Sequence, residues 1–451
     1  MIKKTLALFF FSISLFAQHK LSHPIRVEGE HIQQRTASSD TLKILAVMVQ
    51  FQKDEDSRTS GNGQFDLSTT QQKIIDAPPR DSAYFADHFY FAKNYFTKAS
   101  NGKQNISSTV LGTVITLPKK MQDYAQTNND NTLLARLAEE TWRAADSLNP
   151  KFPFQQYNVF IIFHAGSGKD VDLRGSLGYD PTPYDLPSLY FSLNGFRKIF
   201  FNPSYPGITL KNSSFIIPNS VILPETENRK IPSIGGDFLL QLSINGLLVA
   251  NIASYLGLPD LFDTQTGRTA IGRFGLMDGQ SIFSFSGLFP PEPSAWEKIY
   301  LGWTTPISVP SGNATLRVPS VSLYATGSDT MYKVPISAKE YFLVENRNRD
   351  VAKNGQTLTM KWNGQTITKT FTGDTDHFTN TNIDSTAVYG TVVDVEDLDW
   401  SLPGFINDKN NFTGGLLLWH IDETIIEKNI AGNTINADPN KRGVDVEEAD
   451  G

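Results

Sequence analysis

The sequence predicts a mixed α/β domain, with a twisted mixed sheet and core helices, followed by a β-rich domain. Residues 43–51 (K-I-L-A-V-M-V-Q-F) and 157–163 are continuous apolar runs of strand length, which is typical of strands buried on both faces. Between them, residues 83–98 carry aromatic side chains at helical spacing, and residues 132–147 have the pattern of an amphipathic helix. Because buried strands alternate with helices, this part of the chain falls in the α/β class.

The next segment, residues 235–256, predicts a core helix. Its leucine, isoleucine and valine side chains fall on nearly every helical face, as in a helix that is enclosed on all sides. Three amide side chains inside the segment argue against a membrane span. Gly257 is expected to stop the helix by adopting a left-handed conformation, and Pro259 cannot extend it.

Beyond Trp303 the pattern changes to short strands separated by turns. Residues 357–362 and 365–371 flank the pair Asn363-Gly364, which suits the positive φ angles of a tight hairpin turn. We therefore expect a β-rich second domain.

The amino terminus has the features of a secretory signal peptide. Met1-Ile2-Lys3-Lys4 precedes a short apolar run, and cleavage is expected after Ala17. The run is shorter than the ~20 residues that a membrane-spanning helix needs. The chain has no cysteine, which excludes disulfides and thiol catalysis. We expect a secreted bacterial protein, extracellular or periplasmic, without a membrane span in the mature chain.

The formal net charge of −7 comes without any long basic run, so nucleic acid is not an expected partner. The predicted organisation has four parts: a signal peptide (1–17), a tether or remnant pro-segment (18–40), the α/β domain (41–303) and the β-rich domain (304–451), which we expect to be incomplete at its carboxyl end.

The residues from Leu247 to Asp263 (L-L-V-A-N-I-A-S-Y-L-G-L-P-D-L-F-D) resemble the zinc helix of secreted metallopeptidases of the immune inhibitor A type, peptidase family M-six. That family carries H-E-x-x-H-x-x-G-x-P-D-L-Y-D. Residues 274–279 (F-G-L-M-D-G) are similar to the methionine-bearing turn of metzincins, with Met277 as the methionine, and residues 294–303 are similar to the family's S-A-W-E-K-x-x-L-G-W. The resemblance implies a metzincin-like metallopeptidase domain.

The residues that would carry the family's chemistry are replaced. Alignment on the G-x-P-D string places Ala250 and Ser254 at the two histidine ligand positions and Asn251 at the position of the general-base glutamate. An alanine methyl cannot bind zinc, a serine hydroxyl is a poor ligand, and an amide cannot accept a proton from attacking water. Asp260, at the third-ligand position, would remain nearly alone. The resemblance therefore implies a pseudopeptidase with no catalytic residues and no expected cofactor.

We expect this protein to bind peptide or protein without cleaving it, and two alternatives stay open. An active zinc peptidase would have to take its ligands from Asp260, Asp263, His164 or His420, and zinc is expected only in that case. The two histidines have the simpler interpretation of hydrogen-bonded structural residues. An extracellular adhesion or cell-envelope structural module would depend mainly on the β-rich half.

Calcium is the other cofactor that the sequence leaves open. Carboxylates gather in two runs, and hard cations take several oxygen ligands from loops. Neither run has the spacing of an EF-hand, and solvated turns are the simpler interpretation. The first run comprises Asp374, Asp376 and Asp384, and the second comprises Asp394, Glu396, Asp397 and Asp399.

Overall fold

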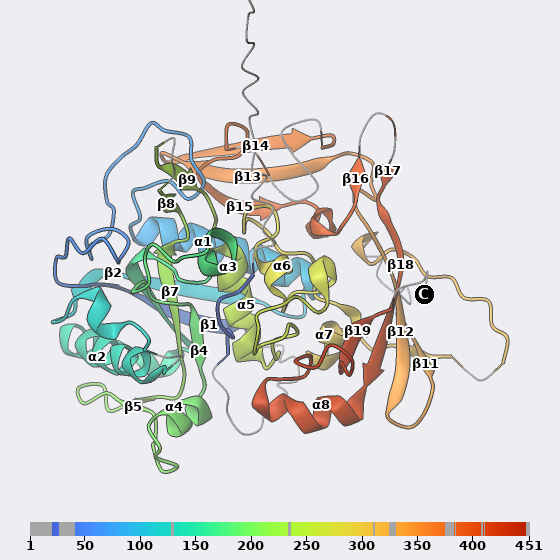
Figure 1. The fold of residues 1–451 in the computed structure, drawn as a ribbon, viewed down its shortest axis with the longest axis horizontal. Helices are drawn as coiled ribbons and strands as arrows, with labels where there is room; N and C mark the ends of the chain where they lie inside the picture. Colours follow the sequence, from blue (N-terminus) through green and yellow to red (C-terminus); the bar gives the residue numbers. More distant parts are fainter. Residues whose placement is uncertain are drawn as a thin grey trace, which may run out of the picture.

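The computed structural model describes residues 20–26, 41–127, 130–232, 236–309, 312–323, 331–374, 383, 385–406, 409 and 411–447. The predicted signal peptide, most of the predicted tether, Asp376, Asp384 and residues 448–451 lie outside these ranges. The described part is mixed α/β, with an α/β body on the left of Figure 1 and a sheet of long strands on the right. At this coarse level the predicted fold class is confirmed.

A five-stranded sheet forms the centre of the α/β body, in the order β2-β1-β3-β7-β4. Its strands are β1 (Leu42–Gln50), β2 (Ile106–Thr116), β3 (Val159–Ser167), β4 (Leu189–Phe191) and β7 (Ser220–Thr226). The first four in this order are parallel, and β4 pairs antiparallel with β7 at the edge. The two predicted buried strands correspond to β1 and β3, whose almost complete burial explains their continuous apolar sequences.

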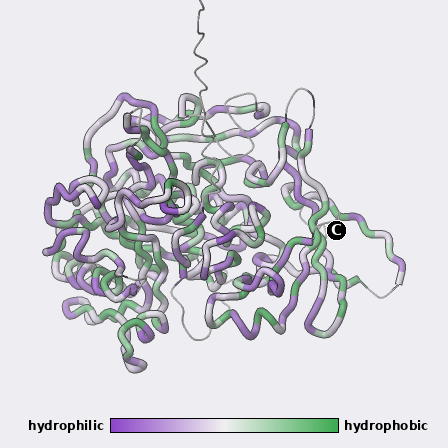
Figure 2. The backbone as a smooth tube through the Cα atoms, in the orientation of Figure 1, coloured by the Kyte–Doolittle hydropathy of each residue, from purple (hydrophilic) through white to green (hydrophobic). Residues whose placement is uncertain are grey.

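Helices cover both faces of this sheet. Ile161 and Phe163 of β3 join the hydrophobic cluster of α1 (Ser82–Ala99) and α5 (Asn245–Leu256), whereas Phe160 and Ile162 join that of α2 (Thr132–Leu148). Alternate side chains of a strand point to opposite faces, so α1 and α5 lie on one side and α2 on the other. In Figure 2 the apolar colour is concentrated in the interior strands and helices.

The predicted core helix is shorter than expected at its amino end. Phe238–Leu240 form β9, which pairs with β8 (Arg229–Ile231), so the prediction of helix is wrong for residues 236–244. Side chains hold the backbone that follows: Asn228 accepts from the Leu242 N–H and Asp76 accepts from the Ile244 N–H. The carboxyl end agrees with the prediction, because Gly257 has φ 111° and caps α5.

Shorter elements complete the α/β body. They are the 3₁₀ helices η1 (Met121–Tyr124), η2 (Phe154–Gln156) and η3 (Gly272–Phe274), the helices α3 (Leu173–Leu177), α4 (Leu193–Ile199), α6 (Gly279–Ile282) and α7 (Ala295–Tyr300), and the strands β5 (Ile208–Thr209) and β6 (Ile216–Ile217).

The carboxyl-terminal part is rich in strands, as predicted. One sheet has the order β10-β11-β12-β18-β19 and another has the order β14-β13-β15. The predicted hairpin is confirmed, because Trp362 pairs with Gln365 across Asn363 (φ 47°) and Gly364 (φ 74°). The elements are β10 (Ile307–Ser308), η4 (Val321–Leu323), β11 (Met331–Pro335), β12 (Glu340–Asn348), β13 (Gln356–Trp362), β14 (Gln365–Phe371), β15 (Thr391–Val395), η5 (Leu398–Ser401), β16 (Phe405–Ile406), β17 (Asn411–Phe412), β18 (Gly414–Asp422), α8 (Glu423–Asn429), η6 (Ile430–Gly432) and β19 (Val444–Val446).

The strand-rich part packs directly on the helices of the α/β body. Asn245 at the start of α5 donates to the Val392 carbonyl at 2.9 Å, and Lys98 of α1 pairs with Asp394 at 2.7 Å. Both parts contribute to one hydrophobic cluster. The division between residues 303 and 304 stays a prediction. Among the helices described, none has the length and apolar character needed to cross a membrane.

Candidate functional site

The degenerate motif lies on α5 inside the protein. Ala250, Asn251 and Ser254 have no exposed surface. The Asn251 amide donates to the Leu247 carbonyl one turn earlier at 2.9 Å. Its Oδ1 and the Ser254 Oγ have no hydrogen-bond partner within the described residues. This helix face therefore presents a methyl, a hydroxyl and an amide where the family resemblance implies ligands and base.

Asp260, three residues after the helix stop, is bound by N–H donors. Its Oδ2 accepts from the backbone N–H of Ile25 at 3.0 Å, from that of Arg26 at 3.4 Å and from the Asn433 amide at 2.7 Å. The Asp260 N–H donates in return to the Asn433 Oδ1 at 2.8 Å. Burial raises the pKa of Asp260 to about 6, although these donors favour its charged form.

The donors from residues 25 and 26 belong to an amino-terminal segment, residues 20–26, whose end meets the edge strand β4 and whose start bonds to residues 170–172. The Tyr190 N–H donates to the Ile25 carbonyl at 2.9 Å, and Arg26 bridges Tyr190 in parallel. Further along, the Ser22 N–H donates to the Asp170 carbonyl at 2.8 Å. The sequence predicts a tether here, because seven residues without periodicity carry no signal that they will pack against the folded domain.

Side chains of the segment are also held. The Arg26 guanidinium donates to the Ser254 carbonyl at 3.1 Å and lies 5.6 Å from the centre of the Tyr190 ring. His23 Nε2 is 2.8 Å from the Ser188 carbonyl oxygen and 3.2 Å from the Asp170 carboxylate. A cavity of about 610 Å³ opens beside His23 and Arg26. The segment thus occupies a groove between β4 and the end of α5, with free volume next to it.

The two other family-like strings meet at Glu297. This buried carboxylate accepts from the N–H groups of Leu276 and Met277, and also from the Ser294 N–H in a capping box at the start of α7. The Met277 carbonyl in turn accepts from the Leu261 N–H at 2.8 Å. Burial raises the pKa of Glu297. The methionine turn is therefore fixed on one side to α7 and on the other to the loop that carries Asp260.

The alternative zinc ligands are not brought together. His164 belongs to the face of β3 that packs toward α2, since it continues the alternation of Phe160 and Ile162 and contacts Phe51. His420 is on β18, 2.9 Å from Glu340. Over the ranges that the structure describes, no group of three or more histidine and carboxylate side chains is arranged to hold a metal. The residues at the motif do not fit catalytic zinc.

Asp263, the remaining alternative ligand, closes its own turn. Its Oδ1 accepts from the N–H groups of Gln265 at 3.0 Å and Thr266 at 3.2 Å. These bonds hold the Asp263 carboxylate against the backbone of its own turn.

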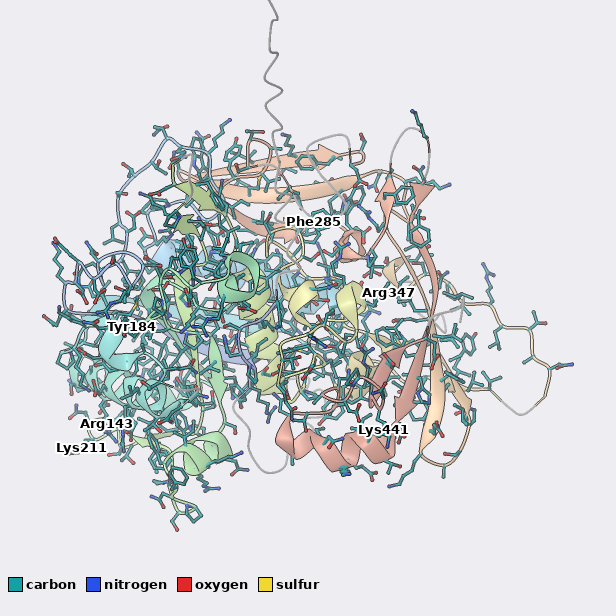
Figure 3. All side chains as sticks on the ribbon, viewed as in Figure 1. Arg143, Tyr184, Lys211, Phe285, Arg347 and Lys441 are labelled. Carbon is teal, nitrogen blue, oxygen red and sulfur yellow. The ribbon has the colours of Figure 1, made fainter. Side chains whose placement is uncertain are left out.

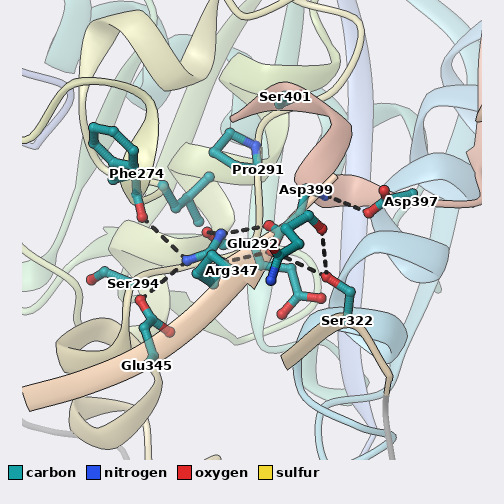
Figure 4. Close-up of polar contacts among 12 residues, drawn as sticks. Phe274, Pro291, Glu292, Ser294, Ser322, Glu345, Arg347, Asp397, Asp399 and Ser401 are labelled. Atoms are coloured by element: carbon teal, nitrogen blue, oxygen red, sulfur yellow. Dashed lines mark hydrogen bonds and ion pairs between the residues drawn. The ribbon is translucent and has the colours of Figure 1, made fainter. Parts of the chain in front are cut away.

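The second acidic run is already engaged by cations and N–H donors. Asp394 pairs with Lys98, and Asp399 forms a bidentate pair with Arg347 (Figure 4). Asp397 accepts from the N–H groups of Asp350 and Asp399, and burial raises its pKa to about 7. Glu396 accepts from the Asn354 amide. Of the first run only Asp374 lies within the described residues, where it contacts Arg349 at 3.4 Å.

Burial lowers the pKa of His164 from 6.5 to about 4. Between these values the unfolded chain binds the proton and the folded chain does not, so stability is expected to fall as the pH drops through this window. The effect is about 3 kcal/mol at most. In urea unfolding at several pH values, His164→Gln should show a flatter dependence of stability on pH than the wild type. Parallel curves for His164→Gln and wild type would contradict this prediction.

Comparison with known proteins adds no relative: no family model matches the chain, and no curated protein matches it significantly. The family resemblance therefore rests on the three sequence strings alone.

Proposed function

We propose that this protein is a secreted, metzincin-like pseudopeptidase of the immune inhibitor A type whose groove holds an extended peptide without cleaving it. The observation that carries the proposal is the use of the Asp260 carboxylate. Its Oδ2 is bound to the backbone N–H groups of Ile25 and Arg26 and to the Asn433 amide. The residue at the proposed third-ligand position thus binds a peptide backbone.

The edge strand β4 supports the same function. An extended segment that hydrogen-bonds to a sheet edge is a common mode of peptide recognition, because backbone bonds supply affinity and side-chain pockets supply specificity. Residues 25 and 26 meet β4 at Tyr190 in this way. Without histidines at positions 250 and 254 and a carboxylate at 251, α5 supplies neither the two zinc ligands nor the general base that the family uses to activate water.

The purified protein is expected to contain no stoichiometric zinc and to leave casein intact. The reason is the replacement of both helical ligands and the base at Ala250, Ser254 and Asn251. Elemental analysis and a fluorescent casein assay check this. Chelator-sensitive cleavage that follows the protein through purification and survives a contaminant control would contradict the proposal.

Peptide binding can be tested by opening the groove in the full chain. Ile25 has no exposed surface, so Ile25→Asp would bury a second carboxylate near Asp260 and should displace the segment. The folded Ile25→Asp variant is expected to bind fluorescent peptides from a casein digest, as measured by polarisation, and the wild type is expected to bind them less. Lys20→Ala is the matched control. A folded Ile25→Asp variant that binds no peptide would overturn the proposed function.

A further inference from the structure

We infer that the groove is selective for one class of peptide: a segment with an aliphatic residue followed directly by arginine, as in Ile25-Arg26. This inference rests on the proposed function and adds to it the identity of the ligand. Residues 20–26, which lie in the groove, serve as the model for such a peptide. Backbone bonds alone would accept almost any sequence, so the selectivity must come from side chains.

The aliphatic position is defined by burial. Ile25 is 0 % exposed and Leu21, four residues earlier, is 1 % exposed, and both belong to the large hydrophobic cluster that contains α5. Ser22 between them is exposed. Burial of an aliphatic side chain contributes about 1.5–3 kcal/mol, whereas a charged or strongly polar side chain at position 25 would lose its hydration without a partner.

The arginine position is defined by acceptors. The Arg26 side chain is only 7 % exposed, donates to the Ser254 carbonyl at the carboxyl end of α5 and lies against the Tyr190 ring. The carbonyl end of a helix favours a cation, and the nearby Asp260 carboxylate has the complementary charge. Ser254 contributes through its backbone, so this acceptor depends on where the helix ends. A glutamate at position 26 would bring a second anion toward the Ser254 carbonyl and the Asp260 carboxylate.

The experiment uses the full-length Ile25→Asp variant and a synthetic peptide of residues 18–27. Isothermal titration should show binding of the parent peptide and of its Lys20→Ala form with similar affinity, since the Lys20 side chain is partly exposed and its ion pair with Asp172, at 3.7 Å, is of the weak surface kind. Peptides with Arg26→Glu or Ile25→Asp should bind at least tenfold more weakly. Equal affinity of the Arg26→Glu and parent peptides would overturn the inference.

The two proposals fail in different ways. If the Ile25→Asp variant binds casein peptides but not the parent peptide, the selectivity is wrong and the proposed function stands. If it binds neither, the proposed function fails as well.

Hydrogen exchange of the Ile25 and Arg26 backbone N–H groups gives a second test of the inference. It does not require the Ile25→Asp variant to fold. In the wild type, the N–H groups of Ile25 and Arg26 should be protected by Asp260. The full-length Arg26→Glu variant should exchange them at least tenfold faster, whereas Lys20→Ala should not. Exchange of both groups at unstructured-chain rates in the wild type would overturn the inference.

Discussion

Replacing Arg347 by alanine is expected to lower the free energy of unfolding by about 3–5 kcal/mol, the range seen when one partner of a buried ion pair is removed. The guanidinium is 1 % exposed and contacts Asp399 at 2.5 and 2.7 Å and Glu345 at 3.3 Å. It also donates to the carbonyls of Phe274 and Glu292 (Figure 4). Figure 3 places Arg347 inside the molecule, toward the right-hand sheet. Its loss would leave two buried carboxylates without their cation.

Urea unfolding checks this prediction, with Lys339→Ala as the control. Lys339 pairs with Glu427 at the surface, where both side chains are more than half exposed, so its loss should change stability by no more than ~1 kcal/mol. A double variant, Arg347→Met with Asp399→Leu, should lose less than Arg347→Ala, because it removes the Asp399 charge together with its cation and leaves only Glu345 without one. If Arg347→Ala is as stable as Lys339→Ala, the contacts of Arg347 do not contribute to the free energy of unfolding as their geometry indicates.

Glu297→Ala is expected to lower stability by on the order of 3 kcal/mol, because the N–H groups of Leu276, Met277 and Ser294 would lose their acceptor in the interior. Release of the desolvated carboxylate offsets part of this loss, and Glu297→Gln should be milder since its amide oxygen still accepts. Thermal melts measure the loss. Hydrogen exchange locates it: the Leu276 and Met277 amides should exchange faster in Glu297→Ala, and unchanged protection there would contradict the assigned role.

Periodic sequence patterns predicted the regular core of this fold. The strands β1 and β3 and the end of α5 at Gly257 follow from burial on both faces and from the left-handed stop, which are local properties. The start of α5 did not follow, because an apolar helix and an apolar strand look alike over a few residues. There, pairing of β9 with β8 decided the outcome.

The occupants of the site could not be predicted from periodicity. Asp260 meets Ile25 from 235 positions earlier and Asn433 from 173 positions later. Neither partner lies in a patterned segment, and an asparagine next to a glycine predicts only a turn. The same holds for Arg347 and Asp399, which are 52 positions apart. The sequence shows where these carboxylates stand along the chain, but it does not show which distant residues bind them.

The convergence of Ile25, Asp260 and Asn433 has a consequence for the order of folding. Contacts over such long separations require large loops to close before they stabilise anything, so they form late. The central sheet and α5 should therefore be assembled before the amino-terminal segment docks. During that interval the groove would be accessible to other chains. Which peptide occupies it would then depend on whether residues 20–26 dock faster than a competing peptide binds.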